Sequence, residues 1–260
     1  MRMHGANRAM TKSRLVLEIA AVTHQGCVRT RNDDTIAVNT WRSSDPMVAP
    51  LSTRQPLDRP HVMVVCDGMG GQPGGRIASL TAIEALIGSL PLCLEDREIA
   101  DRITQASVLL NELARQDASL QWMGTTVAGI LVTPDTCFWF NVGDSSVFRL
   151  KGYLVKLSHD DTHGGKRTGV ILQALGGTPL VADITPHVGR VSIADGVSFL
   201  ICSDGLTDAV SIDQIEDEMH GTAHDIVDRL LNLALIAGAR DNVSIIMIHV
   251  CSEGGDLADG

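Results

Sequence analysis

Apolar segments of two different periodicities occupy the first half of the chain. Residues 15–22 and 34–39 alternate loosely, as strands do, and the continuous apolar run His61–Cys66 is typical of a buried strand. Beyond that run, apolar residues recur at helical spacing and predict helices over about 75–90 and 96–119. The first half is therefore expected to pair strands with two long helices.

Alternation returns in the second half. Short apolar segments joined by tight turns predict an antiparallel meander of strands over 125–132, 136–142, 147–150 and 153–157. Later segments predict a helical turn over 171–175, helices over about 211–219 and 222–237, and strands over 197–202 and 243–250. Strands in groups and helices in pairs are typical of an α+β sandwich, with two mainly antiparallel sheets inside and helices outside.

The pattern predicts one domain. No linker rich in proline, glycine and serine divides the 260 residues, so we expect a single domain over 14–251. A disordered tail is expected over 1–13, and a flexible C-terminal tail over 252–260. The stretch 40–60 carries four prolines and little periodicity, which predicts a long surface loop.

Composition narrows the possible partners. Apolar residues make up 44% and aromatic residues 3%, so the core must be aliphatic and base-stacking surfaces are not expected. A net charge of −10 argues against nucleic acid or an anionic membrane as a partner. No run approaches the roughly 20 apolar residues that a membrane span needs. The six cysteines form no CxxC pair, which favours reduced thiols and a cytoplasmic location.

Aspartates follow the ends of predicted core strands. The sequences Cys66-Asp67-Gly68 and Cys202-Ser203-Asp204-Gly205 repeat one pattern of apolar strand, Asp and Gly, and similar positions hold Asp33, Asp34, Asp144 and Asp241. Each alone also fits an ordinary aspartate in a turn. A cluster of carboxylates needs cations or protonation to persist, and oxygen ligands favour Mg²⁺ or Mn²⁺. Such a two-metal site activates water for phosphoryl hydrolysis, but spacing leaves open whether these residues converge.

An ordered set of motifs carries a family resemblance. In chain order the set is Val28-Arg29-Thr30-Arg31-Asn32-Asp33-Asp34, Cys66-Asp67-Gly68-Met69-Gly70-Gly71, Gly124-Thr125-Thr126, Val142-Gly143-Asp144-Ser145, Leu157-Ser158-His159-Asp160-Asp161, Gln173-Ala174-Leu175-Gly176, Cys202-Ser203-Asp204-Gly205-Leu206-Thr207-Asp208 and Arg240-Asp241-Asn242. From about residue 20 to 250 it resembles the metal-dependent serine/threonine phosphatases of the protein phosphatase 2C type, in their bacterial form. The resemblance implies a β-sandwich of two mainly antiparallel sheets flanked by pairs of α-helices.

The resemblance also implies a two-metal centre. Asp67 would bridge two Mn²⁺ or Mg²⁺ ions, and the Gly68 carbonyl would bind one of them. Asp204 and Asp241 would complete the shell of the other ion. Asp34 would act through metal-bound water. The implied reaction is hydrolysis of phosphoserine or phosphothreonine by direct attack of a metal-bridging hydroxide.

Further positions extend the implied site. Arg29 falls where the family's arginine grips the substrate phosphate, which suits a bidentate guanidinium contact. Asp33 stands where the family usually has Glu and is a candidate ligand. Asp144, with Asp204, would hold a third ion, to which Asp208 could contribute. The implied partner is a phosphorylated protein, the substrate of a cognate serine/threonine kinase.

The positions expected to recognise the substrate depart from the family pattern. Gln72 replaces the usual histidine of the glycine turn, and Asp161 stands where the family usually has His. His159 and His163 are candidates to take over the role of the missing histidine. Both also fit ordinary solvated loop residues. The flap is shortened to 162–172, which predicts an open site, and the 40–60 loop could supply recognition. Two alternatives stay open: a catalytically weak phosphatase-like regulatory or binding module, and a hydrolase of small phosphoesters.

Overall fold

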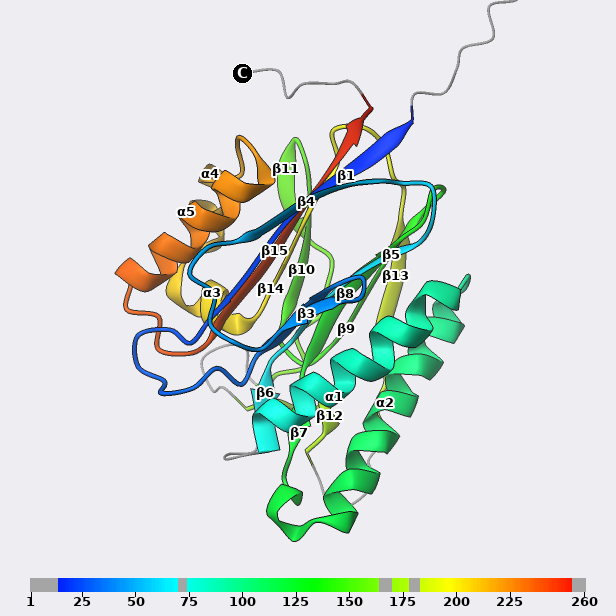
Figure 1. Cartoon of the computed structure of the whole chain (residues 1–260), viewed down its shortest axis with the longest axis vertical. Coiled ribbons are helices and arrows are strands. Elements are labelled where there is room, and N and C mark those ends of the chain that lie inside the picture. Colours follow the sequence, from blue (N-terminus) through cyan, green and yellow to red (C-terminus); the bar gives the residue numbers. More distant parts are fainter. Residues whose placement is uncertain (1–13, 70–73, 164–169, 178–182, 254–260) are drawn as a thin grey trace, which may run out of the picture.

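A β-sandwich with helices on both outer faces forms the body of the molecule (Figure 1). The structure, a computed structural model, describes residues 14–69, 74–163, 170–177 and 183–253. The predicted tail over 1–13 and all but the first two residues of the tail over 252–260 lie outside the described residues.

Two six-stranded sheets face each other and a small third sheet lies at one end. The first sheet has the strand order β11 (Tyr153–Lys156), β10 (Ser146–Lys151), β14 (Ser198–Cys202), β15 (Val243–Ser252), β1 (Leu15–His24) and β4 (Leu51–Pro56). The second has the order β13 (His187–Val191), β9 (Cys137–Val142), β8 (Val127–Val132), β5 (His61–Cys66), β2 (Thr35–Val38) and β3 (Trp41–Ser43). The third joins β12 (Leu175–Gly176), β7 (Gly124–Thr125) and β6 (Gly68–Met69).

Helices cover the outer face of each sheet (Figure 1). The second sheet is covered by α1 (Gly74–Ser89) and α2 (Asp96–Gln116). The first sheet is covered by α3 (Asp204–Ala209), α4 (Ile212–Asp217) and α5 (Ala223–Ile236). Short 3₁₀ helices follow α1 and α2, over Leu90–Leu92 and Ala118–Leu120.

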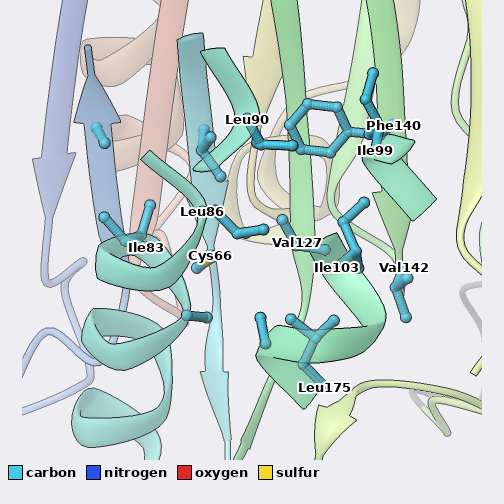
Figure 2. Close-up of a cluster of buried hydrophobic side chains, with 14 of the residues drawn as sticks. Cys66, Ile83, Leu86, Leu90, Ile99, Ile103, Val127, Phe140, Val142 and Leu175 are labelled. Atoms are coloured by element: carbon cyan, nitrogen blue, oxygen red, sulfur yellow. The ribbon is translucent and has the colours of Figure 1, made fainter. Parts of the chain in front are cut away.

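Mainly aliphatic side chains, together with the four phenylalanines, fill three layers, one between the sheets and one under each set of helices. In the layer under α1 and α2, Leu86 and Ile103 point toward Val127 and Cys66 of the sheet (Figure 2). Burial raises the pKa of the Cys66 thiol, so this residue acts as a small apolar group. All six cysteines are free, as the sequence predicts.

The sequence prediction of the two-sheet sandwich and of its long elements is confirmed, but the single meander is wrong. β8 pairs with β9 and β10 with β11, yet β9 and β10 belong to different sheets. Gly143, at a φ of 98°, turns the chain from one sheet to the other. Periodicity predicts each strand but not the sheet that the strand joins.

Two local predictions also need correction, and two elements were not predicted. The 40–60 loop contains the edge strands β3 and β4, whose half-exposed residues produce no apolar run. Residues 171–175 are extended rather than helical, because Ile171 bridges to Thr162 and Leu175 begins β12. The helix α3 and the edge strand β13 were not predicted, since one is six residues long and the other holds a glycine.

Candidate metal centre

Strand ends from both sheets meet at the end of the sandwich where the small third sheet lies (Figure 1). In the second sheet, Thr35 opposes Cys66, so the preceding Asp34 lies beside the following Asp67. In the first sheet, Cys202 opposes both Ser146 and Ile245. The residues just outside these pairs therefore share one edge, and they include Asp144, Asp204 and Asp241.

The main chain of Asp67 is clamped by the Gly-Thr-Thr segment. Its N–H donates to Thr126 Oγ1 at 3.1 Å, and its carbonyl accepts from Thr126 N at 2.9 Å and Thr125 Oγ1 at 2.8 Å. Thr126 Oγ1 also lies 2.7 Å from the hydroxyl of Ser145, which precedes β10 of the first sheet. These contacts fix the aspartate between the two sheets.

The glycine after each site aspartate is required by close approach of other backbone. A Cβ on Gly68 would overlap the carbonyl of Gly75 at the start of α1. A Cβ on Gly205 would overlap the carbonyl of Asn242. The repeated Asp-Gly pattern thus has one physical cause at both positions: a carboxylate placed where two main chains touch.

Asp34 is fully buried at the centre of this edge. Its Oδ2 accepts a hydrogen bond from Ser244 Oγ at 2.7 Å, whereas Oδ1 has no hydrogen-bond partner among the described residues. Burial, opposed by the Ser244 hydrogen bond, raises the pKa of Asp34 to about 7. A buried acceptor of this kind is satisfied by a proton or by a cation.

Asp67 and Asp204 carry the same electrostatic signature. Burial, and then the charges of Asp34 and Asp204, raise the pKa of Asp67 well above its ordinary value. Burial, and then the charges of Asp144 and Asp208, raise the pKa of Asp204 to about 7. Oδ1 of Asp204 is a second buried acceptor without a hydrogen-bond partner in the described part of the chain. The sequence-predicted aspartates other than Asp33 are therefore brought into electrostatic contact with one another.

Asp241 reaches the cluster from the start of β15. Its Oδ2 accepts a 2.6 Å hydrogen bond from Arg29, and its Oδ1 accepts one of 2.9 Å from Asn242 N. The Asp241 carboxylate raises the pKa of Arg29, and more distant Asp67 adds to this effect. Arg29, 58% exposed, therefore lies at the mouth of the carboxylate cluster with its guanidinium held by a candidate ligand.

Asp33 points elsewhere. Both of its carboxylate oxygens accept hydrogen bonds from Arg31, at 2.9 and 3.1 Å. Its main-chain N–H donates to Asn242 Oδ1, and Asn242 in turn donates to the Arg31 carbonyl. Of the two neighbouring aspartates, the structure thus gives Asp34 to the cluster and Asp33 to an ion pair beside it.

A cleft of about 650 Å³ opens beside Asp241, with Gly205 and Asp208 in its walls. The cleft lies between α3 and the segment that joins α5 to β15. Gln72 and part of the shortened flap, over 164–169, lie outside the described residues. The described flap stems pair as a short ladder, with His163 N donating to the Val170 carbonyl at 3.0 Å.

Several supporting residues were missed as functional by sequence reasoning. Three of them, Thr125, Thr126 and Asn242, belong to the family motifs. The motifs alone do not indicate that these residues hold the main chain of the aspartates. Ser244 lies outside those motifs, and its role as the donor to Asp34 depends on the pairing of β15 with its neighbours. Its position two residues after Asn242, on the cluster side of the strand, could have suggested it.

The fold and site define the class of protein. A model of the family described as protein phosphatase 2C matches residues 51–235, and the chain belongs to that family. The chain is 27% identical to the serine/threonine protein phosphatase PstP of Mycobacterium tuberculosis, over 93% of this chain and 46% of PstP. It is 24% identical to the protein phosphatase PhpP of Streptococcus pneumoniae, over 92% of this chain and all of PhpP.

Solved structures agree with this classification. The catalytic domain of PstP in complex with two manganese ions superposes with a TM-score of 0.75 at 25% identity, covering 92% of this chain and 100% of that one. The chain spans about half the length of the PstP protein it matches. Among the described residues, no helix is long and apolar enough to cross a membrane.

Proposed function

We propose that the protein is a metal-dependent phosphoprotein phosphatase that hydrolyses phosphoserine and phosphothreonine with Mn²⁺ or Mg²⁺. The observation that carries the proposal is the carboxylate cluster in which Asp34 is fully buried, Asp67 and Asp204 are half-buried, and all three pKa values are raised. The names of the relatives PstP and PhpP, and the two manganese ions in the PstP structure, support it.

The donor set fits hard divalent cations. It consists of carboxylates and the Gly68 carbonyl, and two carboxylate oxygens, Oδ1 of Asp34 and Oδ1 of Asp204, are buried acceptors that lack a donor. In the part of the chain that the structure describes, no three His, Cys, Asp or Glu side chains already surround one ion position. We infer that Asp241, which now accepts a hydrogen bond from Arg29, would turn to the cation to complete a shell.

Each residue then has a separate task. Asp67 and the Gly68 carbonyl would hold two ions, with Asp204 and Asp241 on one of them and Asp34 acting through water; Asp33, tied to Arg31, could do so only after leaving that ion pair. Asp144 and Asp208, which raise the pKa of Asp204, would hold a third ion. Bound divalent cations lower the pKa of water and offset the charge of a phosphate.

Arg29 would bind the substrate phosphate once it leaves Asp241. Its guanidinium lies at the exposed edge of the cluster, where a planar fork can bind two phosphate oxygens. The cleft beside Asp241 has room for residues that flank a phosphorylated side chain. We therefore expect a phosphorylated protein as substrate and a serine/threonine kinase as the opposing enzyme in a signalling pathway. Six free thiols favour the cytoplasm.

The test is hydrolysis of a phosphothreonine peptide and of p-nitrophenyl phosphate, with Mn²⁺ and with chelator. We expect turnover of both with Mn²⁺, and a loss of at least about 100-fold in Asp204→Asn, because a cation ligand is replaced by a neutral amide. Metal-independent turnover, or full activity of Asp204→Asn, contradicts the proposal.

The same assay separates the two alternatives. The open cleft favours a hydrolase of small phosphoesters as the second candidate, and turnover of p-nitrophenyl phosphate without turnover of phosphopeptides or phosphoproteins would support it. Binding of phosphopeptide without turnover of either substrate would instead indicate a phosphatase-like binding module.

A further inference from the structure

Asp161 is the centre of a hydrogen-bond cluster beside the carboxylates. Its side chain is 11% exposed. Oδ1 accepts from Gln173 Nε2 at 2.7 Å and lies 2.8 Å from His187 Nε2, and Oδ2 accepts from Gly143 N at 2.9 Å. One carboxylate thus contacts three segments: Gln173 directly after the flap, β13 and the turn between β9 and β10.

The main chain of Asp161 repeats two of these links. Its N–H donates to the Gly143 carbonyl at 3.0 Å, and its carbonyl accepts from Leu172 N at 2.7 Å. Both polar main-chain groups of Gly143 are therefore held by one residue. Gln173 continues the cluster, since it exchanges two hydrogen bonds with the main chain of Thr185, of 2.9 and 3.2 Å.

Gly143 matters because the next residue is Asp144. The Gly143 carbonyl belongs to the peptide group that joins the two residues, so fixing it fixes the direction in which Asp144 leaves the turn. Gly143 has a φ of 98° and a Cβ there would lie 2.7 Å from the Thr126 side chain, so the turn has no room to relax by shifting toward β8. Asp144 in turn lies close enough to Asp204 to raise its pKa.

From this geometry we propose that Asp161 is a positioning residue: it ties Leu172–Gln173, at the end of the flap, and β13 to the Gly143 turn and so sets the position of Asp144 beside Asp204. The inference rests on the proposed function only in the role given to Asp144. It assigns to the shortened flap a task other than covering the substrate, because the flap stem becomes the outer support of a candidate cation ligand.

The chain offers a matched control at the adjacent position. Asp160 is also an aspartate, but its carboxylate accepts from Lys156 on the same hairpin and from no group of the Gly143 turn that the structure describes. Asp160→Asn therefore removes the same charge from the same segment and spares the cluster.

The first measurement is hydrogen exchange at the Gly143 amide, which needs no activity. We expect Asp161→Asn to speed this exchange about tenfold, the equivalent of one charge-assisted hydrogen bond, and Asp160→Asn to leave it within twofold. Equal exchange in the two variants overturns the proposal. If Asp161→Asn does not fold, His187→Leu removes one donor from Asp161, and an unchanged Gly143 exchange rate in that variant overturns the proposal as well.

The second measurement places the effect at Asp144. Calorimetric titration with Mn²⁺ should show weaker binding in Asp161→Asn by about tenfold, and no further weakening when Asp161→Asn is added to Asp144→Asn. Independent, multiplying effects of the two substitutions contradict action through Asp144. Because exchange and Mn²⁺ binding do not require turnover, failure of the phosphatase assay in the wild-type protein is distinguishable from failure of this proposal.

Where the wild-type protein is active, kinetics add a test that a general loss of stability would not pass. Asp161→Asn should lower kcat for p-nitrophenyl phosphate and raise the Mn²⁺ concentration for half activity, with KM within about twofold, because Asp161 touches the ligand's support and not the substrate. A change confined to KM would assign Asp161 to substrate binding instead and overturn the positioning role.

Discussion

At the scale of single residues, Asp34 combines burial with a surrounding of like charges, and both disfavour its ionised form. Asp34 is a fully buried carboxyl, and the charged groups that act on its pKa are the aspartates Asp241 and Asp67. A charge in that position is costly without a counter-charge, so the buried carboxyl holds a proton or binds a cation. The hydroxyl of Ser244 stabilises the carboxylate through one hydrogen bond and so opposes part of the shift in its pKa.

The pH dependence of stability reports this residue in chelator. Folding raises the pKa of Asp34 from 3.8 to about 7, so between these values the folded chain holds a proton that the unfolded chain has released. The stabilisation is thus present below pH 3.8 and is lost as the pH rises through 7, at no more than about 1.4 kcal/mol per pH unit. Asp34→Asn cannot titrate, so the free energy of unfolding of wild type minus that of Asp34→Asn should fall from pH 4 to 7.

The measurement is urea unfolding of both proteins in chelator at several pH values. Asp135→Asn, in the exposed turn between β8 and β9, is the control, and its difference from wild type should be nearly flat over this window. A difference between wild type and Asp34→Asn that rises with pH would show that Asp34 is ionised in the folded protein.

At the scale of elements, strand ends rather than whole strands build the site. β8 illustrates this, because a threonine that makes a side-chain hydrogen bond flanks the strand at each end. Thr126, before β8, accepts from Asp67 N and contacts Ser145, whereas Thr133, after β8, donates to Thr136 within the hairpin turn. The same residue type thus supports the carboxylate edge at one end and an ordinary turn at the other.

We expect Thr126→Val to weaken both folding and cation binding. The substitution keeps the shape but leaves the Asp67 N–H and the Ser145 hydroxyl without their partner, at a cost of about 1–3 kcal/mol in the free energy of unfolding. Because it loosens the Asp67 main chain, Mn²⁺ should also bind more weakly. Urea unfolding and Mn²⁺ titration measure the two effects.

Thr133→Val is the matched control at the other end of the strand. It should lower stability through its own lost turn contacts and leave Mn²⁺ affinity within about twofold, since the turn is remote from the cluster. Equal losses of Mn²⁺ affinity in the two variants would mean that the Thr126 clamp has no specific relation to the ion ligands.

At the scale of the whole molecule, the sequence predicts elements well and their assembly less well. The apolar run before Asp67 and the helical spacing after it were sufficient to predict β5, α1 and α2, because the spacing of apolar residues reflects which face of an element is buried. The crossing at Gly143, the edge strands β3 and β4 and the Arg29–Asp241 ion pair depend on which surfaces meet in three dimensions. The contacts of Asp161 also depend on the three-dimensional assembly, because its partners lie up to 26 residues away and no local sequence pattern predicts them.

The assembled molecule gathers negative charge at one end. Asp34, Asp67, Asp204 and Asp241 come from different strand ends, and their mutual repulsion opposes folding when they are ionised. The chain as a whole carries a net charge of −10, so remote charges do not offset the cluster. Stability of the whole fold is therefore linked to whatever neutralises this one edge.

Divalent cations should accordingly stabilise the entire sandwich, and not only the site. Ions that bind the folded chain alone add RT ln(1 + [L]/Kd) to the free energy of unfolding, about 2.7 kcal/mol at a concentration 100 times Kd. We expect Mn²⁺ to raise the midpoint of thermal unfolding of the wild-type protein at pH 7.5. Matched ionic strength of NaCl controls for screening, and Asp67→Asn, which removes the central carboxylate, should lose most of the Mn²⁺ effect. A rise of equal size in NaCl, or an undiminished rise in Asp67→Asn, would show that general screening rather than ligation at this edge accounts for the stabilisation.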